Sequence, residues 1–254
     1  MIHFVGAGPG AEDLITLRGA SLLEEADCII YAGSLVNPGL LKRAKDGCAV
    51  YNSATMTLEE VLAVMDEQEA AGHMTVRLHT GDPAMYGAIR EQMDALDEKG
   101  IDYDVTPGVS SVFGAAAALD AEFTLPGTSQ TLILTRMAGR TPVPEREELR
   151  RLAEHGTSMA IFLSAGLLED VQKELCAGAF TEASPAAIVY KATWPEEKVL
   201  RCTVGTLAET AARESIRSTA LIFVGDFLTA TPDRSKLYDP AFTTGFREAT
   251  EEKK

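Results

Sequence analysis

Short apolar segments alternate with helical patterns through the first half of the chain, and this alternation restricts the possible folds more than any other feature. The segments that read as strands cover residues 2–5, 28–31, 50–52, 76–79 and 104–106. A helical pattern lies between two of them at 57–69, where Thr57 and Glu60 have the spacing of a capping box. Strands and helices that alternate in this way form a parallel sheet with right-handed crossovers. The sequence therefore predicts an N-terminal α/β domain over residues 1–120.

The second half repeats this pattern with one departure. Its predicted strands cover residues 131–135, 158–163, 186–190, 198–203 and 221–224. No helical pattern separates the strand at 186–190 from the strand at 198–203, which indicates an antiparallel pair in a mixed sheet. We therefore expect a second α/β domain, with a mixed sheet, over residues 121–230.

The ends of this second domain are marked by segments without periodicity. Residues 121–129 contain Pro126 and Gly127, which are turn formers, and we place the domain boundary there. Residues 231–254 read as a C-terminal extension that is partly disordered. Its polar and charged end, from Thr243, is expected to fray.

Composition argues against several classes of protein. The formal net charge of −15 argues against nonspecific binding to nucleic acid or to anionic membranes. The four cysteines form no C-x-x-C pair and no two histidines have metal spacing, so we expect neither a disulfide framework nor a metal site. No apolar run approaches the ~18 residues of a membrane span, and the first strand starts without a preceding signal peptide. We expect a cytoplasmic protein.

The stretch from Val76 to Ala88 is a strong candidate for a ligand site. Its predicted strand ends in a loop at 80–83, here called the central loop, where Gly81 tolerates positive φ and Pro83 fixes φ. We expect Asp82 to cap a helix that runs from about Ala84 to Lys99. Open α/β sheets bind ligands at the carboxyl ends of their strands, although an ordinary strand-to-helix turn would have the same sequence.

Two further strand ends carry glycine-containing loops, at Gly6–Gly10 and at Pro107–Ser111. The first fits the dinucleotide pattern G-x-G-x-x-A, but Pro9 lacks the N–H that would hold a phosphate, and the second strand ends at Tyr31 without the expected acid. Close approach of another group to the backbone, or a purely structural turn, also explains the glycines. The serines of the second loop either bind a ligand or cap the next helix. Three such strand ends would lie side by side along one edge of a parallel sheet.

Four ionisable side chains near predicted loops each allow two interpretations. His79 ends the strand before the central loop and is either a satisfied structural histidine or a catalytic one. Arg136 and Arg140 flank a short loop at the start of the second half, and Lys191 follows the strand at 186–190. Guanidinium groups recognise carboxylates through paired hydrogen bonds, but solvated surface charges would look the same. A Ser-His-Asp hydrolase is not supported, because the chain has no G-x-S-x-G motif.

Together these stretches resemble the tetrapyrrole methylase family, whose members transfer methyl groups from S-adenosylmethionine. The resemblance runs from residue 1 to about 228 and includes Gly6–Gly10, Thr80–Tyr86 and Pro107–Ser111. Three longer strings are more specific, and they are similar to the members that methylate carbon 11 of precorrin-4 in cobalamin synthesis. These strings are Ser129–Arg136, Gly139–Pro144 and Tyr190–Glu196.

The resemblance implies two α/β domains, an active site in the cleft between them, and a homodimer. It implies that the residues at the cofactor are Pro9, Thr80, Gly81, Asp82, Met85, Ser110, Ser111, Leu163, Ala192 and Ala220. It assigns no catalytic base, and it requires no divalent cation because the sulfonium brings its own charge. The candidates for binding the acetate and propionate carboxylates of the tetrapyrrole are Arg136, Arg140 and Lys191.

The function that follows is S-adenosylmethionine-dependent methylation of carbon 11 of precorrin-4 or of its cobalt form, which the sequence does not distinguish. Methylation of another position or ring, such as uroporphyrinogen III, is the alternative within the same fold. A nicotinamide-dependent oxidoreductase, suggested by G-x-G-x-x-A, is the alternative from another class. A non-catalytic sensor of an adenosine ligand is a third.

Overall fold

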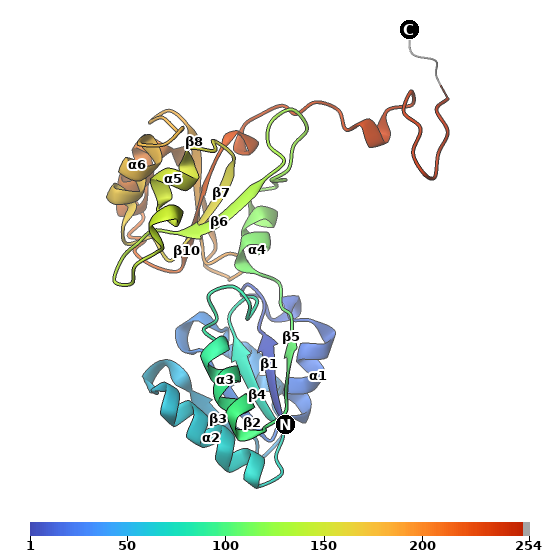
Figure 1. Ribbon diagram of the computed structural model, residues 1–254, viewed down its shortest axis with the longest axis vertical. Coiled ribbons are helices and arrows are strands. Elements are labelled where there is room, and N and C mark those ends of the chain that lie inside the picture. Colours follow the sequence, from blue (N-terminus) through green and yellow to red (C-terminus); the bar gives the residue numbers. More distant parts are fainter. Residues whose placement is uncertain (251–254) are drawn as a thin grey trace. The chain divides into compact units, whose positions relative to one another are not determined.

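The structure, a computed structural model, describes residues 1–250, and the chain divides into two compact units (Figure 1). The first unit contains Met1–Ala118 together with Lys191–Lys198. The second contains Leu119–Tyr190 and the chain from Val199 onward. No sequence pattern indicated that residues 191–198 return to the first unit.

The first unit is built on an all-parallel sheet with the strand order β3-β2-β4-β1-β5. Its strands are β1 (Ile2–Gly6), β2 (Cys28–Tyr31), β3 (Ala49–Asn52), β4 (Thr75–His79) and β5 (Tyr103–Thr106). β1 and β4 are buried along their whole length, as expected for central strands of a sheet that is covered on both faces. The predicted parallel sheet is therefore confirmed.

Helices cover both faces of this sheet (Figure 1). They are α1 (Leu17–Glu25), α2 (Leu58–Ala70) and α3 (Arg90–Lys99), while α4 (Ser111–Ala118) follows β5 in the chain. On one face Leu23 of α1 belongs to the core with Val5 and Leu78. On the other, Met65 of α2 and Leu96 of α3 belong to a second core with other strand residues. The predicted capping box of Thr57 and Glu60 is present at the start of α2.

The structure differs from the prediction after the central loop. α3 begins at Arg90, whereas the sequence indicated a helix from about Ala84. Tyr86 and Ala88 have φ angles of 57° and 49°, which the interior of a right-handed helix cannot accommodate. Asp82 still caps the backbone, because its Oδ1 accepts a hydrogen bond from the Ala84 N–H at 2.9 Å, but it caps a turn.

The second unit contains a mixed sheet with the strand order β6-β7-β10-β8-β9. Its strands are β6 (Leu132–Arg136), β7 (Ser158–Phe162), β8 (Pro185–Tyr190), β9 (Lys198–Thr203) and β10 (Ala220–Val224). β6 and β7 are parallel, while β10 runs antiparallel to both β7 and β8. Ile222 of β10 pairs with Ile161 and Ile188, and these three side chains belong to the core of the unit. The predicted mixed sheet is confirmed.

The second unit also contains three short α-helices, several single-turn 3-10 helices and a C-terminal segment. The α-helices are α5 (Leu149–Ala153), α6 (Leu168–Cys176) and α7 (Leu207–Arg213), and all contribute buried residues to the same core. Near the end, Arg247 donates to the carbonyl oxygens of Leu237, Asp239 and Phe242. The fraying expected from Thr243 concerns in part residues 251–254, which lie outside the described residues.

Within residues 1–250, no helix combines the length and the apolar character that crossing a bilayer requires. In the same range all four cysteines are free, and no group of three or more His, Cys, Asp or Glu side chains is placed to hold a metal ion.

Candidate cofactor site

Three loops that the sequence singled out meet at the carboxyl edge of the first sheet. β1 lies between β4 and β5, so the loops that follow these three strands are neighbours. Gly8 and Gly81 form an antiparallel bridge, with N–H···O distances of 3.2 and 2.9 Å. The Oδ2 atom of Asp82 accepts a hydrogen bond from the Gly108 N–H at 2.9 Å. The convergence predicted from the parallel sheet is therefore present.

The glycines of these loops are required by backbone-to-backbone packing. A Cβ atom on Gly6 would lie 2.5 Å from the Gly108 Cα, and one on Gly108 would lie 2.1 Å from the Gly81 carbonyl oxygen. No real side chain tolerates such distances, so these positions admit only glycine. Of the three interpretations of the first loop, close approach of another group is the one the structure favours. That group is the protein's own backbone.

The segment that contains Trp194 covers the first glycine loop, a contact that the sequence did not predict. The Nε1 atom of Trp194 donates to the Pro9 carbonyl oxygen at 3.2 Å, and the Ala11 N–H donates to the Thr193 Oγ1 at 3.0 Å. Gly10 lies under the indole, because a Cβ atom there would be 2.1 Å from the Trp194 Cδ1. The sequence marked this segment by the string Tyr190–Glu196 and by the single tryptophan of the chain, but neither feature indicated its partner.

Lys191 belongs to this same segment, is partly buried and interacts with two of its side chains. Its Nζ atom lies 5.2 Å from the centroid of the Trp194 ring and 3.4 Å from the Glu196 Oε1. Ala192, which follows it, is buried. A substrate carboxylate that bound Lys191 would therefore compete with Glu196.

The loop edge also contains a polar atom suited to a ligand. The Oγ1 atom of Thr80 is buried and has no hydrogen-bond partner among the described residues. A buried hydroxyl without a partner is costly, and a bound ligand that hydrogen-bonds it removes that cost. Next to it, Gly81 has a φ of 61° and its Cα faces the backbone of Ser110 and Ser111. Met85 is half-buried after the same loop.

Of the alternatives left open for the two serines, the structure shows helix capping for Ser110, and ligand binding by either serine stays a prediction. Ser110 caps α4, since its carbonyl oxygen accepts from Phe113 and Gly114 and its Oγ accepts from Val112 at 3.4 Å. Ser111 is the first residue of α4 and is half-buried beside Gly81. Phe113, two residues further along α4, is 58% exposed, which is high for an aromatic residue.

In the second unit, two residues expected at the cofactor lie at one edge of the sheet, and positive φ angles occur at one of them and directly before the other. Leu163 follows β7 with a φ of 52°, and Thr219 precedes β10 with a φ of 54°. The pairing of Ile222 with Ile161 brings Ala220 level with Leu163, whose side chain is 66% exposed. Positive φ in non-glycine residues is costly and gathers at functional sites. The structure thus brings Leu163 and Ala220 together.

Arg136 and Arg140 lie on the loop after β6, as predicted, but Arg136 is engaged by its own loop. Its Nη1 donates to the carbonyl oxygens of Met137 and Thr141 at 3.2 Å each, and its Nη2 donates to that of Pro142 at 2.7 Å. Arg140 is exposed. Arg136 therefore shapes the loop, and any carboxylate that it binds must compete with three carbonyl groups.

His79 is neutral in the folded protein. Its ring is 3% exposed and lies 6.1 Å from the ring of Phe4, and its Nε2 has no partner among the described residues. Burial, together with the positive charge of Arg77, lowers the pKa of His79 from 6.5 to about 3. A group with such a pKa is a weak base at neutral pH, which favours the structural interpretation of His79 over the catalytic one.

We expect His79→Leu to reduce the loss of unfolding free energy that the wild type shows between pH 7 and pH 5. The folded-state pKa lies below the unfolded value, so the unfolded chain binds the extra proton and stability falls as pH drops from 6.5 toward 3. At pH 5 this costs the wild type on the order of 2 kcal/mol relative to pH 7. Urea unfolding at both pH values measures it, with the exposed His155→Gln as control. If the difference in unfolding free energy between the two pH values is the same in His79→Leu as in the wild type, His79 is protonated in the folded protein.

Comparison with known proteins identifies the family. The model of the Tetrapyrrole (Corrin/Porphyrin) Methylases matches residues 1–208. The chain belongs to the tetrapyrrole methylase family. Among similar tetrapyrrole methylases, the cobalt-precorrin-4 C(11)-methyltransferase of Methanocaldococcus jannaschii is 51% identical over 249 residues, which covers 98% of this chain and 96% of that protein. The precorrin-4 C(11)-methyltransferase of a Sinorhizobium species is 44% identical, with coverage of 97% and 98%.

Solved structures of tetrapyrrole methylases have the same fold. The X-ray structure of cobalt precorrin-4 methyltransferase, a cobalamin biosynthetic enzyme, matches with a TM-score of 0.88 and 48% identity, covering 90% of this chain and 96% of that one. Uroporphyrin-III C-methyltransferase from Thermus thermophilus, complexed with S-adenosyl homocysteine, matches with a TM-score of 0.76 and 25% identity, covering 92% and 95%. The family predicted from the sequence motifs is confirmed.

Proposed function

We propose that this tetrapyrrole methylase transfers a methyl group from S-adenosylmethionine to carbon 11 of precorrin-4 or cobalt-precorrin-4 in cobalamin biosynthesis. The observation that carries this conclusion is the identity of 44–51%, over nearly the full length of both chains, to proteins with that activity. The specific strings noted in the sequence support the proposal, and two of them are now placed in the fold. Ser129–Arg136 ends with β6, and Tyr190–Glu196 contains Trp194, which contacts Pro9.

The loops of the first unit fit an adenosine and methionine ligand. In this proposal the Thr80 hydroxyl hydrogen-bonds the cofactor, and the loop at Gly81–Asp82 and the backbone near Ser111 give it a close surface without bulky side chains. Pro9 and Met85 supply apolar contact from the same edge. Leu163, Ala192 and Ala220 are assigned to the cofactor on their resemblance to family positions and on the strain at Leu163. When bound, S-adenosylmethionine supplies an activated methyl group on a sulfonium.

The protein's contribution to the reaction is positioning. The hydrogen bonds of Asp82 to the Ala84 and Gly108 N–H groups fix the central loop, so the groups that face the ligand are ordered before it binds. Holding two reactants in an aligned, near-attack geometry supplies on the order of 7–11 kcal/mol of rate acceleration. No side chain is assigned as a general base.

Arg136→Ala is expected to weaken tetrapyrrole binding roughly 10-fold and to leave S-adenosylhomocysteine binding within a factor of about two. In this proposal Arg136, Arg140 and Lys191 bind substrate carboxylates, and a charged hydrogen bond is worth about 1.5–3 kcal/mol. Because Arg136 also holds its loop, Arg140→Ala is the variant that removes a charge without disturbing those carbonyl contacts. Titration of each variant with both ligands tests it, and parallel loss of both affinities would contradict the assignment.

The cofactor assignment is tested by calorimetric titration with S-adenosylhomocysteine, NADH and NADPH. We expect S-adenosylhomocysteine to bind near one per chain and the nicotinamide cofactors not to bind, because Gly8 packs against Gly81 and Pro9 offers no N–H to a phosphate. Binding of a nicotinamide cofactor alone would restore the oxidoreductase alternative. Methylation of uroporphyrinogen III remains the second candidate, supported by the Thermus thermophilus structure at 25% identity.

We also propose that the protein is a cytoplasmic homodimer. Large apolar side chains remain exposed in the C-terminal segment, at Leu237, Tyr238 and Phe246. Apolar groups of this size, close together in the chain, are typical of surfaces that another protein covers. Light scattering of the purified protein measures the oligomeric state directly.

A further inference from the structure

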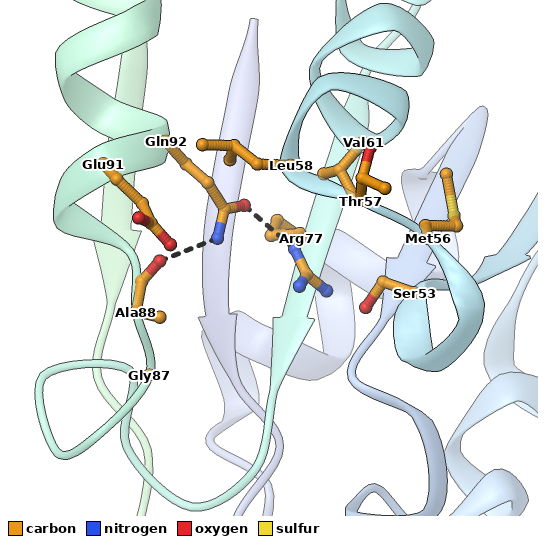
Figure 2. A pocket seen from close by; sticks show the side chains of 10 residues that line it. All are labelled: Ser53, Met56, Thr57, Leu58, Val61, Arg77, Gly87, Ala88, Glu91 and Gln92. Atoms are coloured by element: carbon orange, nitrogen blue, oxygen red, sulfur yellow. Dashed lines mark hydrogen bonds between the residues drawn. The ribbon is translucent and has the colours of Figure 1, made fainter. Parts of the chain in front are cut away.

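A cavity of about 180 Å³ lies on the α2/α3 face of the first sheet, apart from the loop edge described above (Figure 2). Its floor contains Arg77 of β4. The N-terminal turn of α2 contributes Leu58 to one wall, and Glu91 and Gln92 of α3 form the other. Gly87 and Ala88 also line the cavity, and they follow the central loop by only a few residues. Residues of the cavity and of the candidate cofactor site are thus close neighbours in the sequence.

Arg77 is a buried cation without an acidic partner. Its side chain is 6% exposed, its Nε donates to the Gln92 Oε1 at 3.1 Å, and its Nη1 donates to the Ile30 carbonyl oxygen at 3.1 Å. Both acceptors are neutral, and among the described residues no carboxylate forms an ion pair with it. Burial lowers the pKa of Arg77 to about 10, which leaves it charged at neutral pH. Buried charges are normally paired, because an unpaired one is costly.

The neighbouring groups also suit an anion. Gln92 is held in place by its Nε2, which donates to the Ala88 carbonyl oxygen at 3.0 Å, as Figure 2 shows. His79 lies two residues from Arg77 on the same strand, so both side chains project from one face. Its buried Nε2 has no partner among the described residues. Arg77 therefore brings a positive charge to the cavity, the orphaned ring nitrogen of His79 lies two residues further along the strand and outside the cavity lining, and the acidic residue of the lining is the exposed Glu91.

The rest of the lining is mixed. Ser53 and Thr57 offer hydroxyl groups, and Met56, Leu58 and Val61 offer apolar surface beside Arg77. A carboxylate on a short methylene arm uses both kinds of group, with the cation and the hydroxyl groups at its tip and the apolar walls along its stem. Acetate and propionate arms of a tetrapyrrole have this form.

We propose that this cavity binds a side-chain carboxylate of the tetrapyrrole substrate, with the guanidinium of Arg77 as its cationic partner. This inference rests on the proposed function. Arg77 then determines substrate orientation, in addition to the loop arginine Arg136 and to Lys191, whose charges are already engaged by carbonyl groups and by Glu196. Glu91, an exposed carboxylate that lines the cavity, weakens this binding by repulsion.

The test uses uroporphyrin III, a stable octacarboxylate porphyrin, as the probe, and follows binding by porphyrin fluorescence. Arg77→Met should weaken binding roughly 10- to 100-fold, because a charged hydrogen-bond partner is lost. Arg77→Lys, which keeps the charge but loses the planar fork, should lie between. Glu91→Gln should tighten binding several-fold. The same substitution at Glu98, exposed on the same helix and outside the cavity lining, is the matched control and should change nothing.

The outcomes separate this inference from the proposed function. Suppose that the wild type transfers methyl groups to precorrin-4, but that Arg77→Met and Glu91→Gln both bind the porphyrin within twofold of wild type. That result would overturn this inference and leave the proposed function standing. Failure of the wild type to bind uroporphyrin III would also overturn it. A purely structural Arg77 predicts that Arg77→Met lowers the melting temperature and the affinity for S-adenosylhomocysteine to the same degree as porphyrin binding. If Arg77→Met has these general effects, Glu91→Gln decides, because Glu91 is exposed. An unchanged porphyrin affinity in Glu91→Gln would then rule out the carboxylate site.

Discussion

Gly108→Ala is expected to abolish S-adenosylhomocysteine binding and to lower the free energy of unfolding by roughly 3 kcal/mol or more. The added methyl group would lie 2.1 Å from the Gly81 carbonyl oxygen and 2.7 Å from the Gly6 Cα. Both neighbours are backbone atoms in the middle of the sheet edge, so no side-chain rotation relieves the clash. The loops after β1, β4 and β5 must separate, and the Asp82–Gly108 hydrogen bond breaks with them.

The matched control is Gly245→Ala, in the C-terminal segment. A Cβ atom on Gly245 has no atom within 4 Å, and its φ is not in the left-handed region. Urea unfolding and calorimetric titration of both variants give the two readouts. A Gly108→Ala protein with wild-type stability and affinity would mean that the three loops do not pack as described.

Asp82→Asn is expected to weaken S-adenosylhomocysteine binding roughly 100-fold, which corresponds to about 2.7 kcal/mol. The two carboxylate oxygens of Asp82 accept from the Ala84 and Gly108 N–H groups at 2.9 Å each. An amide offers one acceptor and one donor, so one of the two N–H groups would face another N–H group. The side chain keeps its size, and the change therefore isolates hydrogen bonding from packing.

The control for Asp82→Asn is the same substitution at Asp46, which is exposed in the turn before β3. We expect Asp46→Asn to bind S-adenosylhomocysteine as the wild type does. Titration calorimetry at constant ionic strength compares them, since the two variants change net charge equally. An affinity of Asp82→Asn within threefold of wild type would show that the loop is ordered without the carboxylate.

The parts of the fold that local pattern determines were predictable. Alternating strands and helices gave the parallel sheet, and a parallel sheet by itself brings neighbouring strand ends together, so the meeting of Gly6–Gly10, Thr80–Asp82 and Pro107–Ser111 followed. The mixed sheet followed from two strands without an intervening helix. The capping box at Thr57 depends on residues three apart, and it too was found from the sequence.

The parts that long-range contacts determine were not predictable. Residues 84–89 read as helix because their local propensity permits it, yet Tyr86 and Ala88 adopt positive φ in the folded chain. The contact of Trp194 with Pro9 joins positions 185 residues apart, and no local pattern reports it. Arg136 looked available for a ligand, because a sequence does not reveal that three backbone carbonyls of its own loop accept from it.

The most direct test of the proposed function is to incubate the protein with precorrin-4, or separately cobalt-precorrin-4, and S-adenosylmethionine carrying a ¹³C-labelled methyl group. Nuclear magnetic resonance of the product then locates the label. We expect one new labelled methyl group, on carbon 11 of the ring. A label on any other carbon, or transfer to uroporphyrinogen III with none to either precorrin, would contradict it.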